Sequence, residues 1–281
     1  MHSLIPVCET YARAALPALP NAFVLEKAVP TDFEATMYSP VICLILRGAK
    51  ETWSGDHCAR PTAGDALLVS HHVPVRSRII GAGPTQTYLA LVLQLDLRLM
   101  RGLYEQVADH LPPTRDATPL LVKTPDKSVI DVLGRYMALA ENPLDAAVLG
   151  PQVLQEIHYR LLMSDMGAML RDLMTVDSHA SRVAKAIGVI RSRYGSPIAI
   201  NPLAADVGMS PSSFHTHFKH ITGTTPLQYI KDVRLIAARD LLRTQDDSVS
   251  AVSYAVGYES PTHFSRDFAR KFGQPPSRAR G

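Results

Sequence analysis

The sequence predicts an α+β protein of two domains, with an antiparallel β domain and a helical hairpin in residues 1–180 and an all-helical domain in residues 181–281. Three observations support this prediction. Short apolar runs recur about every ten residues between positions 22 and 95, a spacing typical of an antiparallel sheet. From residue 129 onward the apolar positions recur at spacings of three and four, which predicts helices. A segment near residue 210 is repeated 50 positions later.

The composition of the 281 residues excludes several classes of protein. Hydrophobic residues make up 46% and charged residues 20%, as in ordinary globular proteins and unlike disordered chains. No apolar run approaches the ~18 residues that a membrane-spanning helix needs. Residues 1–25 lack a basic stretch that leads into an apolar one, so no signal peptide is expected. Three cysteines, Cys8, Cys43 and Cys58, do not make a disulfide framework and favour a reducing cytoplasm.

The net charge of +3 is unevenly distributed along the chain. Residues 181–281 contain 14 basic and 7 acidic side chains, a net charge of +7, whereas the rest carries −4. A basic C-terminal third on a mildly acidic body suggests contact with a polyanion. An ordinary solvated surface would explain the same asymmetry.

Residues 22–95 are expected to form short strands. Val41–Leu46 is an apolar run with β-branched members, and the turn sequence Arg47–Lys50 follows it. Ala66–Val69 and Tyr88–Leu95 are two further apolar runs, and glycine and proline separate them. This pattern is typical of an antiparallel barrel or of a sandwich, and periodicity does not separate the two.

Helices are expected from residue 96 onward. A first helix within 96–111 would end at Leu111–Thr114, where two prolines interrupt it. Residues 118–125 would then form a connector. The stretch 163–181 is compatible with a helix or with a linker.

Two further helices are expected to form a hairpin between residues 129 and 162. The first has apolar residues at helical spacing from Val129 to Ala140, and Pro143 would end it. The second would begin near Pro151, because proline suits the first turn of a helix. The hairpin would pack on the β domain, on a second copy of the chain, or on both.

The C-terminal third contains an internal repeat. Ser210–Lys219 (SPSSFHTHFK) and Ser260–Ala269 (SPTHFSRDFA) share Ser, Pro and two Phe at a constant offset of 50 residues. A Val-Gly pair precedes each copy, and a glycine followed by a proline comes after each. So many matching positions indicate a duplicated structural unit.

Each copy predicts a helix, a glycine turn and a second helix. In the first copy Gly208 suits a turn with positive φ, and Ser210 would cap a helix whose first residue is Pro211. Phe214 and Phe218 are four residues apart and would face the core. The outer face would then carry small and polar residues, as in a helix-turn-helix whose second helix enters the major groove of DNA.

The segment between the copies predicts a connecting helix. Apolar residues recur at helical spacing from Leu227 to Leu241, with Lys231, Arg234, Arg239 and Arg243 interleaved. Roughly 17 helical residues span about 25 Å, so such a rod could hold the two units about one DNA turn, ~34 Å, apart.

At these positions the C-terminal 100 residues resemble the AraC/XylS-type transcription regulators, whose DNA-binding domain has two helix-turn-helix units joined by a long helix. The most specific segment is Ala255–Pro276 (AVGYESPTHFSRDFARKFGQPP). The resemblance implies units at about 200–220 and 248–271. Two departures from the family pattern are Ala199, at a position that usually carries a capping Thr or Ser, and Pro261, which cannot read a base by a hydrogen bond.

The resemblance also implies which side chains contact DNA. Arg266 is the best candidate for direct base contact, because arginine can bind guanine through two hydrogen bonds. Lys219 and Arg270 are expected to contact phosphates. The complete set of predicted DNA-binding residues is Ser212, His215, Thr216, Lys219, Thr262, Ser265, Arg266 and Arg270.

The N-terminal part resembles the sensor subgroup of the same family through Val41–Lys50, Gly64–Pro74 and Gln155–Leu162. This resemblance implies a cupin-like β-barrel that binds a small organic effector, followed by helices that pair two subunits. Candidate pocket residues are Trp53, His71 and His72, although a lone Trp on a barrel strand is more often a core residue than part of a pocket wall.

Metal and enzyme chemistry are disfavoured. His71 and His72 are adjacent, so on a strand they would point to opposite faces and could not bind one ion. His215, His217 and His220 lack nearby carboxylate or cysteine partners for a metal. No phosphate-binding loop or nucleophile elbow is present. We therefore expect no metal, no cofactor and no catalytic residues.

The sequence thus predicts a cytoplasmic bacterial transcription regulator, not an enzyme, that binds promoter DNA as a homodimer. It would contact RNA polymerase if it is an activator, and no membrane. Two alternatives stay open: a nonspecific DNA-binding protein, and a cupin-type enzyme with a basic helical interaction module.

Overall fold

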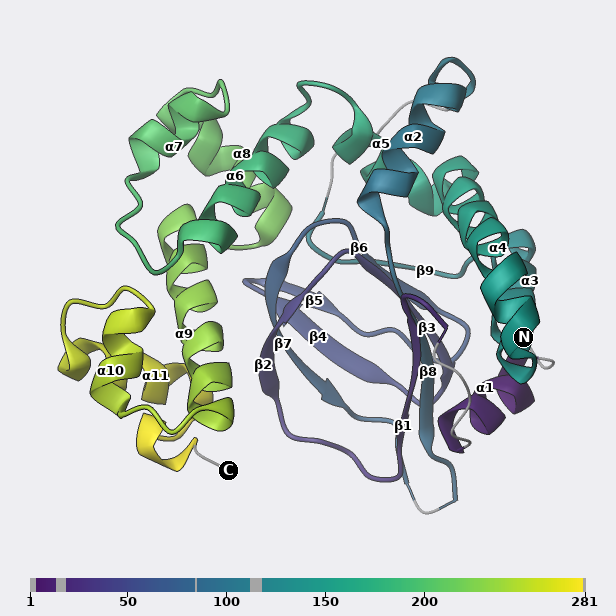
Figure 1. The fold of residues 1–281 in the computed structure, drawn as a ribbon, viewed down its shortest axis with the longest axis horizontal. Helices are drawn as coiled ribbons and strands as arrows, with labels where there is room; N and C mark the ends of the chain where they lie inside the picture. The colour runs from purple at the N-terminus through teal and green to yellow at the C-terminus, as the bar shows by residue number, and fades with distance from the viewer. Residues whose placement is uncertain (1–3, 14–18, 84, 112–117, 280–281) are drawn as a thin grey trace.

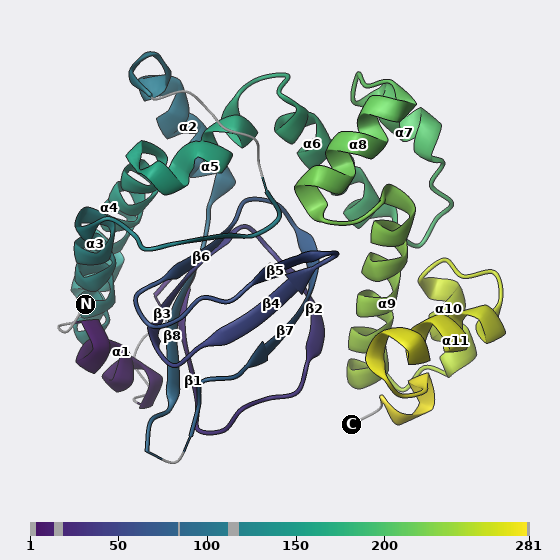
Figure 2. The same cartoon turned by 180° about the vertical axis from the view of Figure 1, so that it is seen from behind.

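A computed structural model describes residues 4–13, 19–83, 85–111 and 118–279 (Figure 1). Two antiparallel sheets and their flanking helices make up the N-terminal part, and helices make up the C-terminal part. Figure 2 shows from behind that the helices α3 and α4 cover one side of the sheets, whereas α9 runs along the other. Among the described residues no helix is long and apolar enough to cross a bilayer.

The strands form a five-stranded sheet of order β1-β8-β3-β6-β9 and a four-stranded sheet of order β2-β7-β4-β5. The predicted strands near 41, 66 and 88 are confirmed, whereas one closed sheet is not: the described strand pairs make two sheets, so the barrel stays a prediction. The strand bounds are β1 (Ala22–Lys27), β2 (Glu34–Tyr38), β3 (Val41–Arg47), β4 (Lys50–Ser54), β5 (His57–Ala59), β6 (Ala66–Val69), β7 (Val73–Ile79), β8 (Tyr88–Gln94) and β9 (Leu121–Lys123).

The apolar runs of the larger sheet are continuous because the sheet is buried on both faces. In β3, Cys43 and Ile45 point into the core between the two sheets. Ile42 and Leu44 point the other way, into the core beneath the helices. Alternate residues on a strand therefore enter different cores.

Five helices flank the sheets on the N-terminal side. The predicted helix after residue 96 is α2, whose cap Asp96 accepts hydrogen bonds from the amides of Arg98 and Leu99 at 2.9 and 3.0 Å. It ends at Val107, and the predicted break at Leu111–Thr114 lies largely outside the described residues. The helix bounds are α1 (Leu4–Arg13), α2 (Leu97–Val107), α3 (Lys127–Ala138), α4 (Pro143–Met163) and α5 (Ala168–Met174).

The predicted hairpin is formed by α3 and α4, but its second helix begins earlier than expected. Pro143 is the first residue of α4 and does not end α3, because Asn142 caps the new helix and accepts hydrogen bonds from the amides of Leu144 and Asp145. Pro151 lies inside α4. The expected connector at 118–125 contains the short edge strand β9.

The C-terminal helices confirm the duplicated plan. They are α6 (His179–Arg193), α7 (Ile200–Asp206), α8 (Pro211–Thr222), α9 (Pro226–Thr244), α10 (Val249–Ala255) and α11 (Pro261–Phe272). The stretch left open at 163–181 holds α5, a turn and the start of α6. Gly208 and Gly257 adopt positive φ values of 69° and 86° in the two turns. As predicted, the paired phenylalanines of both copies are fully buried.

The two parts of the chain contact each other along α9 and the edge of the smaller sheet. Arg239 of α9 donates a hydrogen bond of 2.7 Å to the carbonyl oxygen of Ala35 in β2. Ser54 at the end of β4 donates one of 2.9 Å to the carbonyl of Thr222. Beside it, Gly55 faces Gly223 so closely that neither position has room for a Cβ.

Candidate nucleic-acid interface

The first helix-turn-helix unit consists of α7 and α8. Ser210 caps α8 and accepts a hydrogen bond from the amide of Ser213 at 3.3 Å, which fixes the direction in which the helix starts. Phe214 and Phe218 pack inward with their ring centroids 5.3 Å apart. The opposite face is exposed and carries the predicted DNA-binding residues Ser212, His215, Thr216 and Lys219.

Ala199 and His217 of the first unit were both singled out in the sequence, and the structure shows what each contacts. Ala199 is the cap residue of α7 and makes no side-chain capping hydrogen bond. His217 does not share the exposed face, because its ring stacks on that of His179 with centroids 3.5 Å apart. Within the described residues no group of three or more His, Cys, Asp or Glu could hold a metal ion.

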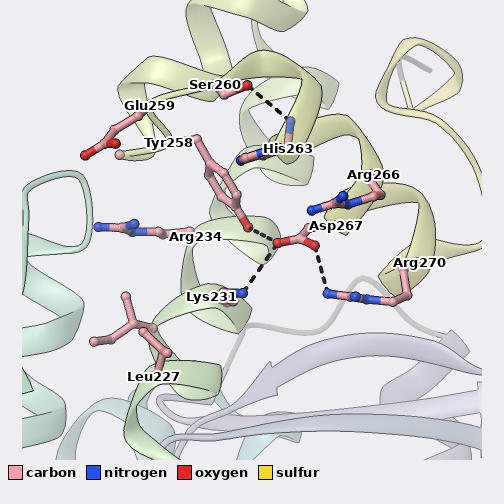
Figure 3. Close-up of a pocket in the computed structure, with 12 residues that line it drawn as sticks. Leu227, Lys231, Arg234, Tyr258, Glu259, Ser260, His263, Arg266, Asp267 and Arg270 are labelled. Atoms are coloured by element: carbon pink, nitrogen blue, oxygen red, sulfur yellow. Dashed lines mark hydrogen bonds and ion pairs between the residues drawn. The ribbon is translucent and has the colours of Figure 1, made fainter.

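The second unit consists of α10 and α11 and has the same layout. Ser260 caps α11 by accepting a hydrogen bond from the amide of His263 at 3.4 Å (Figure 3). Thr262 and Arg266 are exposed, whereas Pro261 and Ser265 are half-buried. Arg266 makes no hydrogen bond or ion pair with the described part of the chain, so its guanidinium is available to a ligand.

A groove with a cavity of about 370 Å³ runs between α9 and the start of α11. Lys231 and Arg234 enter it from α9, and Arg266 and Arg270 enter it from α11 (Figure 3). Four cations on two adjacent helices make this groove attractive to a phosphate backbone.

Asp267 contacts side chains from both helices that line the groove. Its carboxylate is 7% exposed and lies 2.8 Å from Arg270 and 3.8 Å from Lys231. The hydroxyl of Tyr258 donates to it at 3.4 Å. Burial, followed by the charge of Asp267, raises the pKa of Tyr258 far above its usual value, so this hydroxyl stays protonated and remains a donor.

The pairing with Asp267 refines the role expected of Arg270. The Arg270 side chain is 68% exposed and can still reach a phosphate, but it is already partly neutralised. Lys231 and Arg234 were not predicted as site residues, although the sequence contained a signal for them. They are three residues apart on α9, so they share a face, and the same spacing rule places Arg266 and Arg270 together on α11.

The interleaved basic residues of α9 do not all face the same way. Arg239 points to the β domain, where it contacts Ala35 and lies 3.6 Å from Glu34. Arg234 donates to the carbonyl oxygens of Tyr194 and Ser196 at 2.8 and 3.0 Å. These two hydrogen bonds of Arg234 join α9 to the residues that follow α6.

The three predicted effector-pocket residues lie where the sheets meet the C-terminal helices. His71 is buried; its Nδ1 lies 2.8 Å from Ser70 Oγ and its Nε2 lies 3.1 Å from the carbonyl oxygen of Ala180. Burial lowers the pKa of His71 to about 4. His72 accepts a hydrogen bond of 2.8 Å from Tyr229 through its carbonyl. Trp53 donates to Glu51 at 3.1 Å.

A separate cavity lies between the two sheets, away from these residues. Its volume is about 280 Å³. It lies between β1 and β2, and sequence reasoning missed it because its walls come from six strands spread between residues 23 and 94.

Comparison with protein families and known structures agrees with this architecture. The model of the AraC-type transcriptional regulator N-terminus matches residues 18–169, and a helix-turn-helix domain model matches residues 203–281. Similar curated proteins include the HTH-type transcriptional activator RhaS of Escherichia fergusonii, 32% identical over 36% of each chain. RhaS of Pectobacterium atrosepticum is 30% identical over 37% of each chain. The chain therefore matches only about a third of the length of these relatives.

Solved structures show the same fold over nearly the whole chain. An apo variant of ToxT from Vibrio cholerae superimposes with a TM-score of 0.60 at 12% identity and covers 92% of this chain and 96% of ToxT. The structure of unsaturated fatty acid bound ToxT gives a TM-score of 0.52 at 14% identity and covers 92% of each chain. Since the N-terminal family model alone spans more than half of the sequence, this chain belongs to the family of AraC-type transcriptional regulators.

Proposed function

We propose that the protein is a sequence-specific DNA-binding transcription regulator whose residues 181–281 contact promoter DNA. The observation that carries this proposal is the pair of matching helix-turn-helix units, each of which exposes the polar face of its second helix. The 19-residue helix α9 joins them and spans about 28 Å. That length suits two helices in successive major grooves, ~34 Å apart.

In this proposal the contacts divide into base reading and phosphate binding. Arg266 reads a base, because it is exposed and has no partner of its own in the described structure. Ser212, His215, Thr216, Thr262 and Ser265 line the same two faces. Lys219, Arg270 and the additional Lys231 and Arg234 contact phosphates, which position the protein without reading sequence.

The test is selection of bound sequences from random DNA with the full-length protein, followed by competition with bulk DNA at several salt concentrations. A regulator prefers its own site by at least about a thousandfold. Equal affinity for all sequences would support the alternative of a nonspecific DNA-binding protein. Failure to bind any duplex would support the other alternative, an enzyme with a basic interaction module.

Residues 1–180 form the regulatory part in this proposal, with a cupin-like β-barrel that senses a small organic effector. The solved ToxT structure with an unsaturated fatty acid supports the idea that this fold accommodates an organic ligand. Trp53, His71 and His72 would then relay binding to the C-terminal helices, since all three lie at that boundary. The regulator would act in the cytoplasm and would contact RNA polymerase if it activates.

We also propose that α4 pairs two copies of the chain. Leu144, Val148, Tyr159 and Met163 are exposed on α4, and their spacing places them on one stripe of the helix. Leu144 is 70% exposed and Val148 is 55% exposed. A symmetric contact along this stripe would bury these side chains in a homodimer.

A further inference from the structure

The cavity between the sheets opens where two sheet edges face each other. β1 is the edge of the larger sheet and β2 is the edge of the smaller one, and their pairing partners are β8 and β7. No ladder joins β1 to β2 in the described structure, so this side of the domain has an opening. We call the space of about 280 Å³ behind it the edge cleft.

Most of the wall of the edge cleft is apolar. Leu25 of β1, Val41 of β3 and Val92 of β8 line it, and all three belong to or pack against the core between the sheets. Phe23, 46% exposed, stands at the opening. A ligand with an apolar body would bury that body against these side chains.

One cation enters this apolar space. Lys50, the first residue of β4, is half-buried and lines the cleft. Its Nζ lies 5.1 Å from the centre of the Tyr38 ring. Burial by itself would lower the pKa of Lys50, but Tyr38 and Cys43 outweigh burial and raise it. The side chain is therefore an ammonium group at neutral pH.

Lys50 differs from the other half-buried cations of the β domain because no carboxylate lies within ion-pair distance of it in the described chain. Arg47 is 2.5 Å from Glu9, and Arg78 is 2.7 Å from Glu51. The nearest acidic residue on the cleft wall is Glu34, and Arg239 of α9 lies 3.6 Å from its carboxylate. Lys50 interacts with Tyr38 and, at longer range, with Glu34, but it has no ion-pair partner among the described residues, and a bound anion would supply one.

Hydroxyl groups next to Lys50 complete an anion site. Tyr38 donates a hydrogen bond of 3.1 Å to the Oγ of Ser77, which leaves the hydroxyl hydrogen of Ser77 free to donate to a ligand. Both side chains line the edge cleft. An ammonium group and a hydroxyl donor at one end, with apolar walls elsewhere, match a carboxylate on an apolar body.

We propose that the edge cleft is the effector site and that it binds a small organic monocarboxylate, with the carboxylate at Lys50 and Ser77 and the apolar part against Leu25, Val41 and Val92. The proposal rests on the proposed function as an effector-responsive regulator. A single cation disfavours phosphate esters, which need more positive charge. The apolar walls disfavour sugars, whose hydroxyl groups would lose hydrogen bonds there.

The test is isothermal titration of the full-length protein with benzoate and 3-methylbutanoate, and with the neutral amides of both acids. The acids should bind at least about tenfold more tightly than their amides, since a hydrogen bond between charged groups is stronger than one to a neutral amide. Equal binding of acid and amide, or no binding of either acid at about 10 mM, would overturn the proposal.

Substitutions at two lysines locate the site. Lys50→Met should weaken binding of the acids at least about tenfold, and Lys50→Arg should retain most of it. Lys27→Met removes an exposed cation from the end of β1 outside the cleft and should leave binding unchanged. Thermal unfolding of each variant shows that it is folded. Unchanged binding in folded Lys50→Met would contradict the assignment.

DNA binding separates failure of this proposal from failure of the proposed function. Lys50→Met without acid should bind the selected DNA site as the unmodified protein does, since Lys50 lies far from α8 and α11 in the chain and lines a different cavity. Specific DNA binding without acid binding would reject the carboxylate site alone. Acid binding without any specific DNA binding would reject the regulator and keep the site.

Discussion

At the scale of single residues, the inward and outward faces of α8 and α11 could be predicted, whereas the partners of their side chains could not. The repeat placed Phe214 and Phe264 inside, because their positions in a helix determine the face on which they lie. The partners depend on tertiary contacts. Asp267 is buried and pairs with Arg270, three residues away on α11, and with Lys231, which is 36 residues away on α9. Only the first of these contacts follows from helical spacing.

Arg266 provides the most direct test of base reading. Arg266→Ala should weaken binding to the selected site by about 1–3 kcal/mol and relax the preference at one base pair. Quantitative binding to a library of single-base variants would measure both effects. A uniform loss on every sequence would instead indicate that Arg266 contacts a phosphate.

Because His71 is buried, we expect the free energy of unfolding to fall in mild acid. Its pKa is about 4 in the folded protein and about 6.5 when unfolded, so the unfolded chain binds more protons between these values. The free energy of unfolding should therefore fall as the pH drops from about 6.5 to 4, by on the order of 3 kcal/mol. Urea titrations of the unmodified protein and of His71→Asn would show a smaller slope in the variant.

The matched control for His71 is His57→Asn, which changes an exposed histidine in the same domain. It should leave the pH dependence unchanged. If His71→Asn and the unmodified protein lose stability in parallel over this pH range, the buried imidazole is not the titrating group.

At the scale of elements, the sequence predicted most helices and the strands β3, β6 and β8, and it failed where two rules competed. Pro143 was expected to end a helix, although proline is also favoured at the first position of one. Asn142, a strong cap residue, was the signal that could have decided between them. The strand β9 was missed because three residues are too few for a period to appear.

Helix capping predicts opposite changes in the free energy of unfolding for one substitution in each helix-turn-helix unit. Ser248 caps α10 and accepts a hydrogen bond from the amide of Ala251 at 3.0 Å, whereas Ala199 at the same place before α7 cannot. Ser248→Ala should lower the free energy of unfolding by about 1 kcal/mol, and Ala199→Ser should raise it by up to about that amount. Chemical denaturation measures both, and a loss in Ala199→Ser would contradict the pairing.

The exposed stripe of α4 predicts the oligomeric state. Val148→Glu places a charge within the proposed contact, which should turn a dimer into a monomer. Sedimentation velocity measures the change. Val176→Glu is a matched control, because Val176 is 76% exposed in the turn after α5, and it should leave the dimer intact. A monomeric unmodified protein would reject the contact.

At the scale of the whole molecule, the contact between the two parts could not be predicted from the sequence. Arg239 and Ala35 are 204 positions apart, and neither the charge split nor the repeat indicates which helix lies against which strand. Arg239 resembled the other basic residues of α9, all of which were compatible with DNA binding. The direction in which it points depends on how α9 packs.

We expect the contacts of Arg239 to stabilise the packing of α9 against β2. Arg239→Met removes the hydrogen bond to Ala35 and the ion pair with Glu34, so hydrogen exchange should become faster in β2 and in the second half of α9. Arg243→Met, on the same helix and exposed, should leave exchange unchanged. Equal exchange in both variants would show that Arg239 does not hold β2 against α9.

Strand β2 belongs to two surfaces at once: Tyr38 lines the edge cleft, and Ala35 is bonded to the helix that joins the two DNA-binding units. Thermodynamic reciprocity follows for any ligand of the cleft that changes how β2 lies. If saturation with that ligand alters the affinity for DNA by some factor, saturation with DNA must alter the affinity for the ligand by the same factor. Through β2, binding at either site would change the affinity at the other. Promoter binding would therefore alter the affinity of the protein for the ligand of the edge cleft.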